Sequence, residues 1–177
     1  IISLPPAERS DPKAVLEYYK EVGKATELPL FVQAVGNMTV ESLVEIHKAI
    51  PTMRYVKYEA RQPLAAIGQL RRNSSDQIEV FTGSHGRTLI DEMLRGSAGS
   101  MPAASFGDLY AQVWDLWQEG KRKEALDMWG KTATLITELG VYSGIETLKY
   151  ILYVRGVFKT YSIRRNPRQG FAEADKV

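Results

Sequence analysis

Lys57 stands where a short run of aromatic and β-branched residues gives way to a helical pattern. The run, residues 54–57, predicts a buried strand, and residues 63–70 predict the helix that follows it. In an α/β protein, catalytic side chains gather at the carboxyl ends of the strands. A partly desolvated lysine there can lose its proton near neutral pH and attack a carbonyl carbon. The alternative is a strand-end lysine whose ammonium group simply extends to water.

The composition narrows the classes of function. The chain has 177 residues, of which 44% are hydrophobic and 25% charged, as is ordinary for a globular domain. A net charge of +2 gives no basic field of the kind that binds nucleic acid. The absence of cysteine excludes disulfides, thiol nucleophiles and cysteine metal sites. Two histidines, His47 and His85, are too few for a histidine-based metal centre, so we expect no metal.

The amino-terminal residues and the hydropathy pattern bear on location. No apolar run has the length of a membrane span, and Ile1-Ile2-Ser3-Leu4 is too short for the core of a signal peptide. We therefore expect a cytoplasmic protein that does not interact with membranes. The chain opens without methionine, in the middle of an apolar run. We expect it to be part of a longer protein.

Strands alternate with helices over residues 1–106, and polar caps mark the helix starts. Asp11 before Pro12 is one such start, and Thr39 precedes another helical pattern. Alternation in units of roughly 20–30 residues implies parallel strands joined by helical crossovers. The expected strands are residues 1–4, 29–35, 54–57, 78–82 and 99–103. The expected helices begin at Pro12 and after Thr39, and cover residues 63–72 and 88–94.

Residues 107–177 carry a different pattern. Three consecutive helices are expected there, at residues 109–119, 122–139 and 143–155. The three tryptophans of these helices are expected to be packing residues. Five strands with their helices make about half of an eight-stranded barrel, since a complete barrel needs roughly 250 residues. We predict an α/β fold in which residues 1–106 are part of a (β/α)8 TIM barrel and residues 107–177 are a C-terminal helical extension.

Five short motifs occur together at barrel spacing. They are Leu4-Pro5-Pro6, Tyr18-Tyr19 with residues 25–31, Tyr55-Val56-Lys57 with Glu59-Ala60, Phe81-Thr82-Gly83, and residues 96–101. From Ile1 to about Pro167 the chain resembles the dihydrodipicolinate synthase / N-acetylneuraminate lyase family of class I aldolase-type barrels. The resemblance implies that the chain corresponds to strands four to eight of that barrel and its C-terminal helices.

The resemblance also implies a reaction at Lys57, which would form a Schiff base with the C2 carbonyl of a 2-keto acid. The cationic imine withdraws electrons from C3, so that a C3 proton or the C3–C4 bond can leave. Gly83 and Met101 match family positions that line the pocket around the imine and the keto-acid carboxylate. Because the lysine supplies the electron sink, no cofactor is expected, and the expected partner is a small-molecule 2-keto acid. The family is commonly tetrameric, so a homo-oligomer, tetramer or dimer, is expected.

Two departures from the family pattern point to a subgroup. The tyrosine that shuttles protons in most members is replaced by Gln33, whose amide cannot act as a base. Met38 stands where an arginine typically grips a dicarboxylate substrate. Val32-Gln33 and the Lys57-x-Glu59 spacing resemble the subgroup that contains L-2-keto-3-deoxyarabonate dehydratase. That resemblance makes Glu59 the candidate proton-transfer group, and the alternative is that Glu59 only forms an ion pair with Lys57 or a nearby arginine.

The expected function is therefore a Schiff-base-forming lyase that removes water from a 2-keto(-3-deoxy) sugar acid. A pyruvate-dependent aldolase of the same family and an inactive, family-derived binding protein or fragment are the alternatives. In a barrel His85 would lie on the catalytic face and could bind a distal hydroxyl or carboxylate, although it could equally cap its loop. The expected catalytic residues are Lys57 and Glu59, and the expected substrate-binding residues are Gln33, Thr39, Gly83, His85 and Met101.

Overall fold

The computed structural model describes residues 1–3, 11–141 and 144–164. The chain divides into two compact units, Ile1–Pro102 and Ala103–Val177. Whether the predicted division after residue 106 separates two domains stays a prediction. The predicted strand end at Leu4-Pro5-Pro6 lies outside the described residues, as does the tail beyond Arg164.

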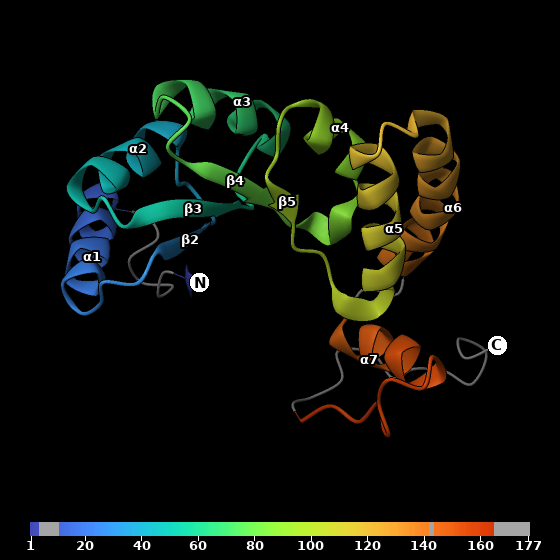
Figure 1. Cartoon of the computed structure of the whole chain (residues 1–177). Coiled ribbons are helices and arrows are strands. Elements are labelled where there is room, and N and C mark those ends of the chain that lie inside the picture. The colour runs from blue at the N-terminus through green and yellow to red at the C-terminus, as the bar shows by residue number, and fades with distance from the viewer. Residues whose placement is uncertain (4–10, 142–143, 165–177) are drawn as a thin grey trace. The chain divides into compact units, whose positions relative to one another are not determined.

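The first unit contains a five-stranded sheet in the order β1-β2-β3-β4-β5, and every neighbouring pair is parallel. Figure 1 shows the helices α1, α2 and α3 against the sheet of this unit. Consecutive strands are sheet neighbours, each connected to the next by a helical crossover, which confirms the predicted α/β alternation. The strands are β1 (Ile2–Ser3), β2 (Leu30–Ala34), β3 (Met53–Tyr58), β4 (Glu79–Thr82) and β5 (Gly99–Ser100).

The helix starts of this unit follow from local sequence. The carboxylate of Asp11 accepts a hydrogen bond from the backbone N–H of Lys13 at 2.9 Å, and proline occupies the first helical position. The next helix begins with a capping box, in which Thr39 Oγ1 accepts from the Ser42 N–H and Ser42 Oγ accepts from the Thr39 N–H. Both predicted caps are confirmed. The helices are α1 (Pro12–Lys24), α2 (Val40–Ala49), α3 (Pro63–Asn73) and α4 (Leu89–Leu94), with a 3₁₀ turn η2 (Ser84–Gly86) before α4.

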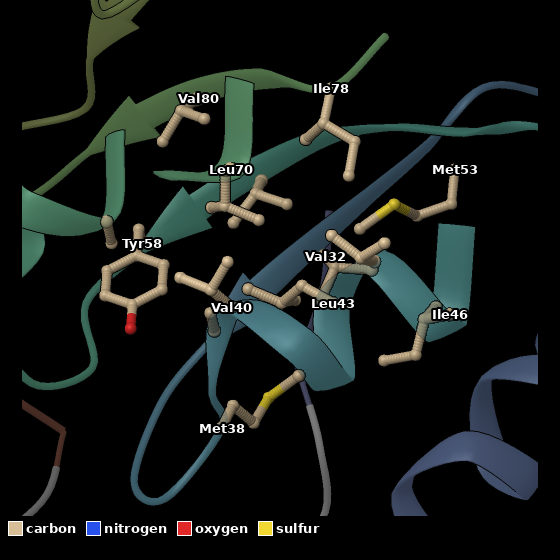
Figure 2. Close-up of a cluster of buried hydrophobic side chains, with 14 of the residues drawn as sticks. Val32, Met38, Val40, Leu43, Ile46, Met53, Tyr58, Leu70, Ile78 and Val80 are labelled. Atoms are coloured by element: carbon tan, nitrogen blue, oxygen red, sulfur yellow. The ribbon is translucent and has the colours of Figure 1, made fainter. Parts of the chain in front are cut away.

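The two faces of the sheet differ in burial, because successive side chains of a strand point to opposite faces. Val32, Val56 and Val80 are fully buried and belong to the hydrophobic core that the strands form with α1, α2 and α3. Figure 2 shows this core, with Leu43 and Leu70 of the helices among the strand side chains. The intervening residues of the same strands are only partly buried and lie on the opposite face.

The last strand is shorter than predicted. Residues 99–103 were expected to be extended in the sheet, but β5 ends at Ser100, and Pro102 follows after one further residue. Proline has no N–H to donate to a ladder, and the alanines after it have little preference for strands. The chain instead forms a 3₁₀ turn, η3 (Ala104–Phe106).

The second unit contains the three predicted helices: α5 (Gly107–Gln118), α6 (Arg122–Val141) and α7 (Ile145–Val154). Within this unit Arg155 donates to Asp108 Oδ2 at 2.6 Å and to the backbone carbonyl of Ser105, so that the end of α7 is connected to the start of α5. Trp117 is buried, and the guanidinium of Arg122 lies 3.8 Å from the centre of its ring. Among the described residues no helix is both long and apolar enough to cross a membrane.

Candidate active site

The register of the sheet brings Gln33 and Lys57 together. Gln33 of β2 pairs with Lys57 of β3, and Lys57 pairs in turn with Phe81 of β4. Partners in a parallel ladder project to the same side, so these three side chains form one row across the sheet. The row lies on the face opposite the helix-packed core, near the carboxyl ends of the strands. The sequence placed Lys57 at a strand end, but only strand pairing brings Gln33 beside it.

Glu59 is the centre of a small polar network. Its Oε2 lies 3.0 Å from Lys57 Nζ and accepts a hydrogen bond from Gln33 Nε2 at 2.7 Å. Its own N–H donates to the carbonyl of Ala34 at 2.9 Å, which extends the β2–β3 pairing by one residue beyond β3. The side chains of Lys57 and Glu59 are 17% and 23% exposed, so the ion pair is largely, but not completely, shielded from solvent.

Opposing effects act on the Glu59 carboxylate. Burial on its own would raise its pKa, but the hydrogen bonds from Gln33 and Lys57, the Lys57 charge and the backbone N–H of Ser84 together hold the pKa below its ordinary value. Glu59 is therefore ionised at neutral pH and can accept a proton. Gln33 donates to it but cannot take up a proton itself.

Gly83 makes room for this network. A Cβ at Gly83 would lie 2.0 Å from Glu59 Oε1 and 2.9 Å from Lys57 Cε, closer than real Cβ contacts. A side chain at this position would therefore occupy the space that the carboxylate fills. The glycine that follows β4 thus packs directly against both candidate catalytic residues. Glycine suits this position because it has no side chain that would collide with them.

An aromatic layer lies on the same face of the sheet, and sequence reasoning did not single it out. Phe31 stacks on Tyr55 with ring centres 5.4 Å apart, and Phe31 lies 5.1 Å from Phe81. Phe31 and Tyr55 each precede a site residue by two positions, so the period-two alternation of the strands could have identified them. These rings give the surface next to the Lys57 amine an apolar character.

Ser84 is a second contributor that sequence reasoning missed. Its backbone N–H interacts with the Glu59 carboxylate from the turn that follows β4. Backbone donors leave no signature in residue type, so a sequence offers no direct signal for them. His85, the next residue of that turn, is exposed and has a φ of +56°. Its predicted role in substrate binding stays a prediction.

The two remaining predicted binding residues have other contacts. Met101 is partly exposed, and its N–H donates to the carbonyl of Thr82 at 2.8 Å. This hydrogen bond places Met101 beside Thr82, the residue that directly precedes Gly83. Thr39 is exposed and uses its hydroxyl in the capping box of α2. It lines a separate cavity of about 330 Å³ whose lining residues include Tyr58 but neither Lys57 nor Glu59. Its predicted contact with substrate therefore has no support from this geometry.

The chemical capacity of the site follows from these contacts. An amine next to an ionised carboxylate, on a partly shielded and partly apolar surface, can form an imine with a ketone and transfer protons beside it. Among the described residues no group of three or more histidine, aspartate or glutamate side chains could hold a metal ion.

Comparisons with known proteins identify the family and the fold to which the chain belongs. The family model described as the dihydrodipicolinate synthetase family matches residues 5–175. The chain is 22% identical over 165 residues to 4-hydroxy-tetrahydrodipicolinate synthase 2 of Clostridium acetobutylicum, which covers 88% of this chain and 56% of that protein.

Solved structures give the architecture. Dihydrodipicolinate synthase from Rhodopseudomonas palustris matches with a TM-score of 0.84 at 23% identity, over 98% of this chain and 61% of that one. N-acetylneuraminate lyase from Fusobacterium nucleatum matches with a TM-score of 0.80 at 20% identity, over 93% of this chain and 57% of that one. The chain thus spans between 56% and 61% of the length of these relatives, and its parallel sheet with helices is part of a (β/α)8 barrel. With its family model matched over nearly the whole sequence, the chain belongs to the dihydrodipicolinate synthetase family.

Proposed function

We propose that the protein is a Schiff-base-forming lyase that removes water from a 2-keto-3-deoxy sugar acid. The observation that carries the proposal is the contact of 3.0 Å between the Lys57 amine and the Glu59 carboxylate, with Gln33 donating to the same carboxylate. This arrangement supplies one nucleophile and one proton carrier. It differs from a site with a tyrosine at position 33, because an amide can orient the carboxylate but cannot relay a proton.

The first step is imine formation at Lys57. The ammonium group gives a proton to Glu59 or to water, and the free amine attacks the C2 carbonyl of the keto acid. The hydroxyl group of the resulting carbinolamine takes that proton back and leaves as water, which gives a protonated imine between Nζ and C2 and returns Glu59 to its ionised form. The aromatic layer on the same face of the sheet, in which the ring centres of Tyr55 and Phe81 lie 6.4 Å apart, supports a less hydrated site that favours the imine.

The second step uses the imine as an electron sink. Glu59 removes a proton from C3, and the electron pair of the C–H bond moves toward the imine nitrogen to give an enamine. The C4–O bond then breaks with expulsion of the hydroxyl group as water, which takes up the proton that Glu59 carried. Hydrolysis of the remaining imine releases a 2-oxo product and restores the Lys57 amine.

The pyruvate-dependent aldolase is the second candidate, because it uses the same imine. Its C3–C4 bond breaks while a base takes the proton of the C4 hydroxyl, and Glu59 is the group available for that task as well. The Val32-Gln33 and Lys57-x-Glu59 pattern, which resembles the dehydratase subgroup, favours dehydration over cleavage of the C3–C4 bond. The substrate, the homo-oligomer and the cytoplasmic location all stay predictions.

Borohydride trapping tests the imine. The intact protein is incubated with pyruvate and sodium borohydride, digested, and analysed by mass spectrometry for a reduced adduct on Lys57. Lys57→Arg keeps the positive charge next to Glu59 but removes the amine, so the adduct should disappear. Lys48→Arg, at an exposed lysine of α2, is the matched control and should leave it unchanged.

Product analysis separates the candidates once the adduct is found. A 2-oxo semialdehyde formed from a 2-keto-3-deoxy sugar acid supports the dehydratase, and pyruvate release supports the aldolase. If the wild-type protein acquires no adduct on Lys57, both lyase mechanisms are wrong and an inactive, family-derived binding protein becomes the better description.

A further inference from the structure

Glu92 is a buried carboxyl group that the mechanism above does not use. It lies on α4, is 1% exposed, and receives hydrogen bonds from two threonines. Thr88 Oγ1 donates to Oε1 at 2.7 Å, Thr82 Oγ1 donates to Oε2, and Ser100 supplies a third hydroxyl contact. Thr82 also lies 3.3 Å from Ser100 through their hydroxyl oxygens. We call these four residues the Glu92 cluster.

A carboxyl group in this position is costly. Burial raises the pKa of Glu92, and the charge of the neighbouring Asp91 acts in the same direction, against the hydrogen bonds from the hydroxyl groups. No cation forms an ion pair with Glu92 among the residues that the structure describes. A leucine or methionine would fill such a site at a lower cost in free energy, so packing alone does not account for a glutamate.

The place of the Glu92 cluster in the sheet suggests what the carboxyl group does. Thr82 is the last residue of β4 and precedes Gly83, while Ser100 is the last residue of β5 and precedes Met101. The N–H of Met101 donates to the carbonyl of Thr82 at 2.8 Å. One carboxyl group therefore ties together the carboxyl ends of two strands, each a single residue before a candidate pocket residue.

Small movements of the β4 end would act directly on the Lys57–Glu59 pair. Gly83 is in such close contact with Glu59 that even an added Cβ would overlap its carboxylate. A shift of the β4 end by a fraction of an ångström would move the Gly83 backbone and the Ser84 N–H relative to Glu59. The β5 ladder is only two residues long and offers little pairing of its own to resist such a shift.

We infer that Glu92 is a positioning residue, whose buried carboxyl group fixes the ends of β4 and β5 and so holds the backbone at Gly83 and Met101 in the geometry that imine formation requires. The inference rests on the proposed function for its kinetic consequence. Its structural consequence, a rigid junction between β4 and β5, does not depend on the reaction.

The test compares three variants of the intact protein. Glu92→Leu removes the carboxyl group and should slow borohydride trapping of pyruvate on Lys57 by about tenfold to a hundredfold, the range expected for a misplacement of up to 1 Å. Glu92→Gln keeps the shape and can still bond to the hydroxyl groups, so it should recover most of the rate. Ser97→Ala is the matched control, because Ser97 also bridges β4 and β5 through a buried hydroxyl, but before β5 begins. Ser97→Ala should lower the free energy of unfolding without slowing the trapping.

Amide hydrogen exchange at Met101 gives a readout that is independent of chemistry. In Glu92→Leu this amide should exchange faster, relative to the amides of β2 and β3, than it does in the wild type. If exchange at Met101 is unchanged, or if Ser97→Ala slows trapping as much as Glu92→Leu does, the positioning role is wrong. A wild-type protein that forms no pyruvate adduct refutes the proposed function instead, and the exchange comparison then decides on the junction alone.

Discussion

Gly83→Ala is the substitution that most sharply tests the geometry of the site. The new Cβ would lie 2.0 Å from Glu59 Oε1, whereas ordinary contacts begin at 3.4 Å, so the carboxylate must retreat by about 1.4 Å. The atoms in the way belong to the ends of flexible side chains, so we expect the protein to fold. The retreat separates Glu59 from Gln33, whose hydrogen bond is 2.7 Å long, and from the Lys57 amine.

The magnitudes distinguish an effect on chemistry from an effect on folding. Loss of hydrogen bonds to a charged group costs about 1.5–3 kcal/mol when the group is buried. Glu59 is 23% exposed and can recover part of this from water, so we expect the free energy of unfolding to fall by about 1–2 kcal/mol. A displacement of about 1 Å at a reacting group lowers a rate by about a hundredfold, or about 2.7 kcal/mol in activation free energy.

The assay measures both quantities on the same samples. The rate of pyruvate trapping on Lys57 reports the site, and urea unfolding reports stability. Gly68→Ala is the matched control, since Gly68 lies within α3, where an alanine meets only the end of the Arg72 side chain. It should leave trapping unchanged and stabilise the protein by up to about 1 kcal/mol. Wild-type trapping rates in Gly83→Ala would show that Glu59 does not occupy the place described.

The remaining predictions concern the two carboxyl groups and the α2 cap. Glu59→Gln keeps the shape of the side chain but cannot carry a proton, so dehydration should fall by about 10²–10⁴-fold. A reduced adduct on Lys57 should still form, but more slowly, because water must then accept the ammonium proton. Equal turnover in this variant would assign the proton transfer to another group. Because the pKa of Glu59 is lowered on folding, its contribution to stability is present above the ordinary value and lost as pH falls through the folded value. The pKa of Glu92 is raised on folding, so its contribution is present at low pH and lost as pH rises through the folded value. Urea unfolding is measured over a pH series. The difference in free energy of unfolding between wild type and Glu59→Gln should shrink as the pH falls, and the difference between wild type and Glu92→Gln should shrink as the pH rises. Differences that change in the same direction with pH would contradict the opposite pKa shifts of the two carboxyl groups. Thr39→Ala should cost about 1 kcal/mol of stability through the lost capping box and leave the KM for the keto acid unchanged, whereas a raised KM would restore Thr39 to the substrate-binding residues.

The sequence predicted the elements of the sheet well because strong local signals mark them. Asp11, Thr39 and Pro63 begin helices by capping or by a fixed φ, and the β-branched runs between them have no competing interpretation. The expected length of β5 was too great, because its small residues have a weak preference for strands and Pro102 ends the ladder. The prediction of a closed barrel rested more on the resemblance to a barrel family than on the periodicity of the sequence.

The candidate site was only partly within reach of the sequence. The pairing of Lys57 with Glu59 follows from their spacing at the end of a strand, but Gln33 joins them through a register that no local pattern states. The Ser84 N–H is a backbone group and has no residue signature. Glu92 is the clearest omission, since beside Asp91 in a helix it looks like one of a pair of solvent-facing acids, and only the fold shows it to be buried.

The alternation of β2, β3 and β4 has a practical consequence for altering this protein. The sheet packs against its helices through Val32, Val56 and Val80. The side chains of Gln33 and Phe81 project to the opposite face. Substitutions of one set are therefore expected to act on the melting temperature, and those of the other on which ketones are accepted. A library restricted to the second set could explore new substrates at a smaller loss of thermal stability than substitutions in the buried core, because these side chains are only partly buried.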